Sequence, residues 1–551
     1  MDIAVIPGLS IACFVDGDIE AESFGVKNNL TRSPVRDDTL FEAASLTKPV
    51  FAYCVLKLVD EGKLELDVPL VDYYPAYLLE KKVLGHSLRH EGFQSEWFNK
   101  INTRMILSHT SGLPHDNLFR PLRLESIPGS KWMYSSFGYE YLQKVIEYLL
   151  GEPLEETINR LIIHPLGLKN SGMKWREKFG NQASVGHNLT GYPDGKVVKQ
   201  WTAISSVSLY TTARDYGRFL EHLLSDDLFD VMMKPQININ EDTSWGLGIG
   251  LENTRLGDAL WHWGDTGTFR SFFKVYRDSH SGFVYLTNSF NGLSIADEIT
   301  NTLFGDSENR GLSHLNYAQY RSPRIKLLRV FANRDINCGE HLFNELAIKY
   351  PFEFTAGNLN SIGHALIYAD RKEEAIALYE MVIKHYPSNQ ILQIGLSDAY
   401  LALGEYDNAK NILMDTKEIY EDTVVGWYKK MLEVLTDILE EDRQNAEKTL
   451  NEQMKSAAHI YSVKSLCDYG AKLYQMKRTD DALEFLEFCT NKHDESSETH
   501  LRTGTVYMKE GLYDEAIHHF QRALEIEENC WQANQLLEQM IFNKISVKRK
   551  E

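Results

Sequence analysis

The sequence predicts a multidomain protein: an α/β domain built on an antiparallel sheet over residues 1–305, followed by an all-helical repeat domain over residues 324–551. Three observations support this division. Strand-like runs occur near both ends of the first 305 residues, and the sequence pattern between about residues 70 and 200 is largely typical of helices. In the second half, small residues recur at intervals of 34 to 37 residues. A chain of 551 residues is also too long for one hydrophobic core.

The first strands are predicted by two short runs rich in β-branched residues, Leu9–Val15 and Ile19–Val26. Between them stands Asp16-Gly17-Asp18, and Asp-Gly is a preferred pair for a tight hairpin turn. We therefore expect an antiparallel β-hairpin at the start of the chain.

A helix is predicted from near Ser45 to Val59. Apolar residues recur there at helical spacing, and Gly62 follows as a C-terminal stop. Pro49 has no N–H and fits a helix only in its first turn, so the helix begins within a few residues upstream. This places Ser45 at or beside the N-cap, near the positive end of the helix dipole, and puts Lys48 on the same face.

The rest of the first domain is predicted as a helical insertion and a group of C-terminal strands. Gly and Pro punctuate the insertion, and a further amphipathic helix extends to about Leu224. Strand runs are expected at 245–251, 259–264, 269–276 and 283–288, with a turn at 278–282 and a helix at 293–303. Strands at both ends of the domain suggest one sheet closed by the N- and C-terminal segments.

Residues 306–323 are polar and irregular, and we interpret them as a linker. Beyond them, five alanines each lie early in a helix flanked by charged residues: Ala375, Ala409, Ala446, Ala482 and Ala516. Gly363, Gly470 and Gly504 precede three of these alanines at a constant distance, where paired helices must approach closely. The period and the pattern resemble tetratricopeptide repeats over residues 324–551.

Composition and charge exclude several classes of function. The formal net charge of −20 argues against nucleic acid or an anionic membrane surface as a partner. No apolar run approaches the roughly 18 residues of a membrane span, and residues 1–8 do not resemble a signal peptide. The six cysteines lack C-x-x-C spacing, which favours reduced thiols in a cytoplasmic protein over disulfides or a zinc site. No metal or cofactor is expected.

Ser45-Leu-Thr-Lys48 is a candidate nucleophile–base pair. A serine hydroxyl becomes an effective nucleophile only when a neighbouring base removes its proton. A lysine can be that base where burial and nearby positive potential lower its pKa toward neutrality. Because this spacing also arises often by chance, a capped surface helix is the alternative interpretation.

Two further motifs change this balance, since the chain carries three in order: Ser45-Leu-Thr-Lys48, Tyr134-Ser-Ser136 and His262-Trp-Gly264. They resemble the active-site motifs of penicillin-recognising serine hydrolases, the class C β-lactamases and their esterase, D-aminopeptidase and D,D-peptidase relatives. The segments Leu-Ser-His-Thr-Ser-Gly-Leu-Pro and His-Pro-Leu-Gly-Leu between them also resemble that family. The resemblance spans about residues 7–305.

The resemblance implies an acyl-enzyme formed on Ser45, with Lys48 and Tyr134 as the other catalytic residues. Tyr134 can act as a base only if cations such as Lys48 lower its pKa, so either the tyrosine or the serine itself is the group that Lys48 deprotonates. The resemblance also implies an oxyanion hole formed by the backbone N–H groups of Ser45 and Asp265. The substrate-binding residues it implies are Ser136, His262 and Gly264.

The chain departs from the β-lactamase pattern in its second and third motifs. Ser136 stands where those enzymes usually carry asparagine, and His262 where most carry lysine. A histidine at this position resembles the pattern of the D-aminopeptidase and esterase-like branch. The usual histidine pKa near 6.5 predicts only a partial positive charge there at neutral pH. The bulky Trp263 narrows the expected cleft. Together these differences predict poor hydrolysis of β-lactams.

We therefore interpret the chain as a serine acyl hydrolase for a small ester or a peptide-like amide, including a D-amino-acid amide. The alternatives are a D,D-peptidase or weak β-lactamase, and a scaffold whose repeats act beside a vestigial hydrolase. Such repeats offer a concave surface for a peptide, a protein partner or self-association. Among other histidines, His109 is interpreted as structural, and His518 and His519 as a solvated helix face.

Overall fold

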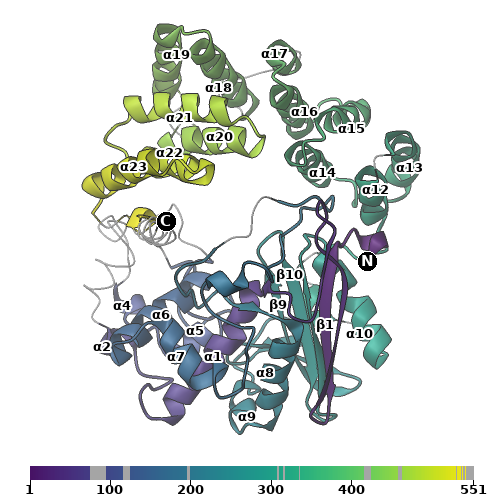
Figure 1. Ribbon diagram of the computed structural model, residues 1–551, viewed down its shortest axis with the longest axis vertical. Coiled ribbons are helices and arrows are strands. Elements are labelled where there is room, and N and C mark those ends of the chain that lie inside the picture. The colour runs from purple at the N-terminus through teal and green to yellow at the C-terminus, as the bar shows by residue number, and fades with distance from the viewer. Residues whose placement is uncertain are drawn as a thin grey trace. The chain divides into compact units, whose positions relative to one another are not determined.

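A nine-stranded antiparallel sheet is the frame of the first of two units, Met1–Arg329, in the computed structural model of the chain (Figure 1). The second unit is Val330–Glu551. The structure describes residues 1–540 except 75–94, 116–123, 195–198, 307–308, 314, 316, 334, 415–423, 457–461, 529, 531, 535 and 538–539.

The strand order is β3-β2-β1-β11-β10-β9-β8-β7-β6. The N-terminal strand β1 pairs with the C-terminal strand β11, as expected for a sheet closed by the two ends of the domain. Asp16 and Gly17 both have positive φ, which is the geometry of the predicted hairpin turn between β1 and β2. The strands are β1 (Gly8–Val15), β2 (Asp18–Asn28), β3 (Ser33–Pro34), β6 (Ile237–Asn238), β7 (Thr243–Trp245), β8 (Gly250–Thr254), β9 (Gly257–Asp265), β10 (Arg270–Tyr276) and β11 (Ser281–Thr287).

The predicted strand at 245–251 is wrong, because a turn divides it. β7 ends at Trp245, and β8 begins at Gly250. Gly248 has a φ of +85°, and a Cβ there would lie 2.2 Å from the Cβ of Ala52. A Cβ on Gly246 would lie 2.0 Å from the carbonyl oxygen of Met232. The glycines therefore form a tight connection against neighbouring backbone.

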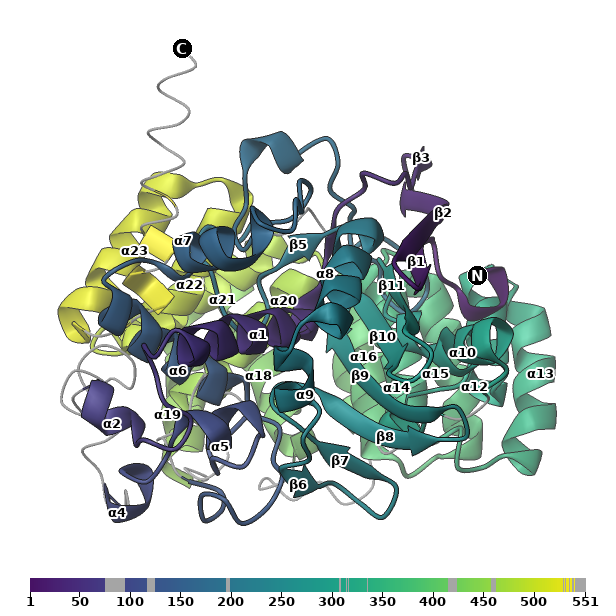
Figure 2. The ribbon, with the colours of Figure 1, turned by 90° about the horizontal axis from the view of Figure 1, so that it is seen from below.

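Helices cover both faces of the sheet, and the strand residues alternate between two cores (Figures 1 and 2). On β1, Ala12 and Phe14 face the core under α8, whereas Leu9 belongs to the core under α10. The helix α1 lies in the larger core beside α7 (Figure 2). The helices of this unit are α1 (Thr47–Asp60), α2 (Leu70–Tyr73), α4 (Ser95–Phe98), α5 (Thr103–Leu107), α6 (Ser136–Leu150), α7 (Leu154–Ile158), α8 (Ala213–Ser225), α9 (Leu228–Met232), α10 (Ala296–Phe304) and α11 (Arg310–Ser313).

The described residues of the segment predicted as a linker, 306–323, belong instead to the first unit and pack on it. Asp306 accepts hydrogen bonds from Lys274 Nζ and Tyr276 Oη, each at 2.9 Å, and Lys274 is fully buried. The N–H of Gly311 donates to Glu252 Oε2 at 3.0 Å, and Glu252 also pairs with Lys274. The polar residues of this segment thus neutralise a buried lysine of β10, which explains why its sequence does not resemble a core element.

The second unit consists of paired helices, as the repeat pattern predicts. All five of the predicted alanines are fully buried, each in the second helix of a pair. A Cβ on Gly363 would lie 2.2 Å from the ring of Tyr379, so the glycine allows α14 to approach α15. The helices are α12 (Pro323–Ala332), α13 (Ile336–Lys349), α14 (Ala356–Tyr368), α15 (Lys372–His385), α16 (Gln390–Leu403), α17 (Tyr406–Met414), α18 (Val424–Leu439), α19 (Arg443–Ser456), α20 (Val463–Gln475), α21 (Thr479–Lys492), α22 (Ser497–Glu510) and α23 (Tyr513–Ile526).

One prediction for the repeats is wrong. His518 is exposed, but its neighbour His519 is buried between α21 and α22. Its Nδ1 lies 3.1 Å from His500 Nδ1, and its Nε2 lies 3.1 Å from Glu487 Oε1. His519 is therefore part of a buried polar cluster of the last repeat.

In the described ranges, no helix has both the length and the apolar character to cross a bilayer.

Candidate active site

Ser45 lies in a short 3-10 turn, Ala44–Leu46, immediately before α1. The N-cap of α1 is Leu46, so the serine stands beside the N-cap. Ala44 has a φ of +52°, a backbone conformation that L-residues seldom adopt. Tyr216 Oη donates to the carbonyl of Leu46 at 2.8 Å, which anchors the turn. Ser45 is partly exposed, whereas the residues on either side of it are buried.

Lys48 brings an amine to the Ser45 hydroxyl. Its Nζ lies 3.1 Å from Ser45 Oγ and donates to the carbonyl of Ser206 at 2.8 Å. The lysine side chain has no exposed surface. Burial lowers the pKa of Lys48 to about 7, while the negative charge of Glu140 opposes this shift. A substantial fraction of the amine is therefore neutral near pH 7 and able to accept a proton.

Ser206 and Glu140 lie beyond the lysine, and neither residue belongs to a motif that the sequence analysis identified. Ser206 Oγ donates to Glu140 Oε1 at 2.8 Å, and the backbone carbonyl of the same serine accepts from Lys48. Ser206 therefore connects the Glu140 carboxylate to the lysine. Gln143 holds the same loop, because its side chain bonds the backbone of Ala203 and of Ser205, each at 2.8 Å. Both Glu140 and Gln143 come from α6.

Tyr134 lies beside the amine. Its ring centroid is 4.9 Å from Lys48 Nζ, and the rings of His109 and Trp263 are 4.3 Å and 4.9 Å away from it. Its hydroxyl is buried and has no hydrogen-bond partner of ordinary geometry among the described residues. Burial raises the pKa of Tyr134 well above its usual value, and the nearby Ser45 hydroxyl offsets this only in part. Of the two groups that Lys48 could deprotonate, Tyr134 and Ser45, the structure therefore disfavours Tyr134.

Ser136 is the first residue of α6 and is partly exposed. The capping residue is its neighbour Ser135, whose Oγ accepts from the N–H of Gly138 at 2.9 Å and donates to the carbonyl of Pro114 at 2.7 Å. His109 Nδ1 accepts from the N–H of Ser135 at 3.1 Å, in agreement with a structural role for this histidine. Ser135 therefore fixes the helix start, and Ser136 remains as the candidate substrate-binding residue.

His262 is neutral at physiological pH. The prediction of a partial positive charge, made from its usual pKa, is therefore wrong. The residue is fully buried on β9, and burial together with the charge of Lys48 lowers its pKa to about 3. Its Nδ1 lies 2.7 Å from the carbonyl oxygen of Trp263, which can only accept, so Nδ1 carries the hydrogen. His262 Nε2 is then an unprotonated acceptor, and it is buried without a partner among the described residues.

Gly264 allows β9 to approach the Ser45 turn. A Cβ at this position would lie 2.4 Å from the carbonyl oxygen of Ala43 and 2.3 Å from Ser271 Oγ. Ser271, which pairs with Gly264 across the sheet, also donates to the carbonyl of Ala43 at 3.2 Å. This close approach brings the end of β9, with Asp265, next to the candidate nucleophile.

The Asp265 side chain has three partners of its own. Its Oδ1 accepts from the N–H of Gly267 at 2.7 Å, and its Oδ2 accepts from Tyr317 Oη at 2.7 Å. Arg270 Nε lies 3.0 Å from the same Oδ2. Tyr317 comes from the segment predicted as a linker, so the sequence offered no sign that it reaches this site.

Comparison with known proteins gives a consistent result. The beta-lactamase family matches residues 1–302, and tetratricopeptide repeats match residues 366–425 and 497–530. Penicillin-binding protein 4 of Amycolatopsis lactamdurans is 24% identical over 339 residues, which are 55% of this chain and 86% of that protein. Esterase EstB of Burkholderia gladioli is 32% identical over 165 residues, 27% of this chain and 42% of the esterase. A beta-lactamase of Providencia stuartii is 26% identical over 234 residues, 39% of this chain and 55% of that enzyme.

Solved structures with a similar first domain include the octameric penicillin-binding protein homologue from Pyrococcus abyssi, with 22% identity and a TM-score of 0.47 over 59% of this chain and 78% of that one. A class C beta-lactamase has 19% identity and a TM-score of 0.46 over 54% of this chain and 91% of its own. The family match covers more than half of the chain. The chain therefore belongs to the beta-lactamase family, through residues 1–302, and carries tetratricopeptide repeats in its second half.

Proposed function

We propose that this protein is a serine acyl hydrolase that forms an acyl-enzyme on Ser45 and hydrolyses a small ester or a peptide-like amide. The observation that carries the proposal is the buried amine of Lys48, 3.1 Å from Ser45 Oγ, with a pKa lowered to about 7. A neutral amine at that distance is positioned as a general base for the hydroxyl.

The proposed reaction has two acyl transfers. Lys48 accepts the hydroxyl proton of Ser45 as Oγ attacks the substrate carbonyl, and the tetrahedral intermediate then loses its alcohol or amine. The leaving group takes the proton back from the lysine, with the Tyr134 hydroxyl as the neighbouring group that relays it. Water repeats the sequence on the acyl-enzyme and restores Ser45.

The developing oxyanion is assigned to the backbone N–H groups of Ser45 and Asp265. Two observations support this assignment. The Ser45 turn stands at the start of α1, where unpaired N–H groups and the helix dipole favour negative charge. The close approach of Gly264 to Ala43 brings the end of β9 against this turn.

The neutral state of His262 supports the proposed substrate class. A carboxylate beside the third motif needs a positive partner, and His262 with a pKa of about 3 does not supply one. Its Nε2 is an unprotonated acceptor, so nothing in this ring attracts a substrate carboxylate. An ester or an amide, including a D-amino-acid amide, is therefore the proposed substrate, in preference to a D,D-peptide or a β-lactam, both of which carry a carboxylate.

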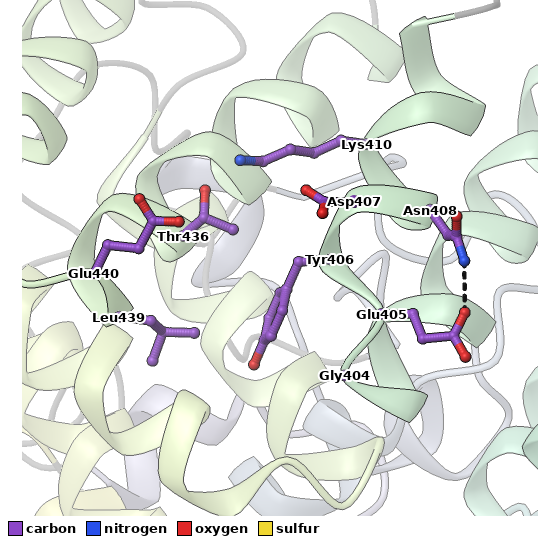
Figure 3. Close-up of a pocket in the computed structure, with 9 residues that line it drawn as sticks. All are labelled: Gly404, Glu405, Tyr406, Asp407, Asn408, Lys410, Thr436, Leu439 and Glu440. Atoms are coloured by element: carbon purple, nitrogen blue, oxygen red, sulfur yellow. Dashed lines mark hydrogen bonds between the residues drawn. The ribbon is translucent and has the colours of Figure 1, made fainter.

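The repeats are proposed to bind a peptide or protein partner, or a second copy of the chain. One hollow of about 490 Å³ lies where α17 begins beside the end of α18 (Figure 3). Its lining is mainly polar, and Asn408 Nδ2 donates to Glu405 Oε2 at 2.6 Å across part of the rim (Figure 3). A scaffold with a vestigial hydrolase is the second candidate function, and the intact pair of Ser45 and Lys48 weighs against it.

A cytoplasmic location is proposed from the cysteines. All six are unpaired, and four of them are buried. Unpaired thiols suit a reducing compartment.

A substrate panel tests the proposed activity. Wild-type enzyme and a Ser45→Ala variant are assayed on a p-nitrophenyl ester, a D-alanine p-nitroanilide and the chromogenic cephalosporin nitrocefin. We expect turnover of the ester or the amide to exceed that of nitrocefin, and all turnover to fall in Ser45→Ala. Nitrocefin as the best substrate by a wide margin would contradict the assignment from His262, and full activity in Ser45→Ala would contradict the hydrolase itself.

A further inference from the structure

Tyr317 lies outside the residues that match the beta-lactamase family, which end at 302, yet its side chain reaches the candidate active site. Its hydroxyl donates to Asp265 Oδ2 at 2.7 Å. Burial and the neighbouring Asp265 raise the pKa of Tyr317, so the hydroxyl keeps its proton and remains a donor. Its ring belongs to the smaller core, together with Trp263 and Tyr134.

The Asp265 carboxylate is held on both oxygens. On one side it accepts from the N–H of Gly267, whose φ of +85° closes a tight turn after β9. On the other side Oδ2 receives the Tyr317 hydroxyl and the ion pair with Arg270. With partners from the chain on both oxygens, the carboxylate fixes the backbone around it.

Arg270 is immobilised in turn. Its guanidinium carbon lies 3.9 Å from the ring centroid of Phe290 and 4.8 Å from that of Tyr317, so the cation is flanked by two aromatic rings. Its Nη1 also donates to the carbonyl of Phe290. Asp265 and Arg270 face each other across β9 and β10, so this arrangement joins the ends of two strands.

The clamped strand end is the one that meets the Ser45 turn. Gly264, one residue before Asp265, lies against the carbonyl of Ala43. Trp263, two residues before Asp265, lies with its ring centroid 4.9 Å from that of Tyr134. Its indole is a hydrogen-bond partner of Tyr317. A shift at Asp265 would therefore move backbone next to the nucleophile.

We propose that Tyr317 is a positioning residue for acyl transfer: together with Arg270 it holds the Asp265 carboxylate, and so fixes the Asp265 N–H that faces the developing oxyanion. This inference rests on the proposed function, because it assumes that Ser45 is the nucleophile. It assigns to the segment after the family domain a part in catalysis that the family domain alone does not supply.

The expected signature is a loss in kcat with little change in KM. An oxyanion site acts on the transition state more than on the bound substrate, so a misplaced N–H slows the chemical step. We expect Tyr317→Phe to lower kcat on a small ester on the order of tenfold, less than the roughly 10²–10³ that follows direct loss of an oxyanion donor.

Tyr320→Phe is the matched control, since it removes the same atom from the same segment. Within the described part of the chain, the Tyr320 hydroxyl accepts a hydrogen bond only from the exposed Arg321. We expect this variant to retain the wild-type kcat and melting temperature, and Tyr317→Phe to stay folded with a lower melting temperature because Asp265 loses a donor. Hydrogen exchange at the Gly267 amide, which Asp265 holds, should be faster in Tyr317→Phe only.

A double-mutant cycle separates a direct effect from one that acts through Asp265. Asp265→Asn keeps the backbone N–H and weakens the side-chain clamp. We expect the double variant Asp265→Asn/Tyr317→Phe to be no slower than Asp265→Asn alone. Additive losses, or a Tyr317→Phe enzyme with wild-type kcat, would overturn the positioning role. Fluorophosphonate labelling of the wild type at a residue other than Ser45 would instead overturn the proposed function, and the two failures are thereby distinguished.

Discussion

Lys48 Nζ lies 3.1 Å from Ser45 Oγ at the end of a side chain with no exposed surface. In this environment the ammonium form has lost its hydration, and the carboxylate of Glu140 is the charge that favours it. Geometry and burial together thus favour Lys48 as the base. Burial raises the pKa of the neighbouring Tyr134, so its hydroxyl stays protonated.

The first prediction concerns the pH dependence of acylation. Because the lysine pKa is lowered to about 7 and only the neutral amine accepts a proton, kcat/KM on a neutral ester should rise with pH through about 7 and then level off. The profile is measured with a substrate that does not titrate between pH 5 and 9. A rate that stays constant down to pH 5 would contradict Lys48 as the base.

Glu140→Gln gives a sharper form of this test. Its negative charge raises the pKa of Lys48, so removing that charge should move the acid limb of the profile to lower pH. Glu156→Gln is the control, since Glu156 is exposed on α7. A shift of the acid limb to higher pH in Glu140→Gln would contradict the claim that the Glu140 charge raises the pKa of Lys48.

The second prediction is that Lys48→Met stabilises the fold. The unfolded lysine binds a proton up to its usual pKa near 10.4, but the folded one only below about 7, so the wild type is penalised between these values and most strongly at or below pH 7. After loss of the bond to the Ser206 carbonyl, we expect a net gain on the order of 1–3 kcal/mol near pH 7.

Urea denaturation across the pH range measures this effect. The gain should shrink as the pH approaches 10, because the unfolded lysine then also loses its proton. A variant less stable than the wild type at pH 7 would contradict a destabilising, desolvated lysine at this position.

The third prediction separates activity from stability at Tyr134. The hydroxyl is buried without a partner of ordinary geometry in the described part of the chain, so Tyr134→Phe should leave the melting temperature unchanged or raise it. Turnover should fall by on the order of 10²–10⁴, the usual scale for loss of a proton-relay group. Calorimetry and ester kinetics on the same preparation test both statements, and a stable variant with full activity would remove Tyr134 from the mechanism.

The fourth prediction concerns where the catalytic unit ends. A fragment of residues 1–329 should retain small-ester activity, because every residue assigned to the site lies within it. A fragment of residues 1–305 should be less stable and less active, since it lacks Asp306, a partner of the fully buried Lys274, and Tyr317. Thermal melts and ester kinetics compare the two fragments. Equal stability and activity would show that the segment after residue 305 is dispensable.

Local patterns in the sequence predicted the parts of the fold that depend on local physics. The Asp16-Gly17 turn, the start of the helix after Ser45 and the close-contact Gly363 each follow from backbone freedom or from helix periodicity. The three motifs indicated the catalytic candidates because Ser45 and Tyr134 come just before the starts of α1 and α6, and His262 lies on β9.

Other features depend on burial by distant segments, and the sequence could not show them. The pKa of His262 follows from complete desolvation on β9, and nothing in its neighbours in sequence indicates that degree of burial. The segment 306–323 is polar and irregular in sequence, and the residues that Asp306 and Tyr317 bind, Lys274 and Asp265, are distant from it in the chain. Glu140 raises the pKa of Lys48 through its charge and accepts a hydrogen bond from Ser206, and neither residue lies in a recognisable motif.

Covalent labelling of Ser45 tests the central claim most directly. The full-length protein and a Ser45→Ala variant are treated with a fluorophosphonate, and the adduct is mapped by peptide mass spectrometry. We predict one adduct per chain, on the peptide that contains Ser45, formed more slowly in Lys48→Ala and absent from Ser45→Ala. Labelling that persists at the same rate in Ser45→Ala would contradict the assignment of Ser45 as the nucleophile.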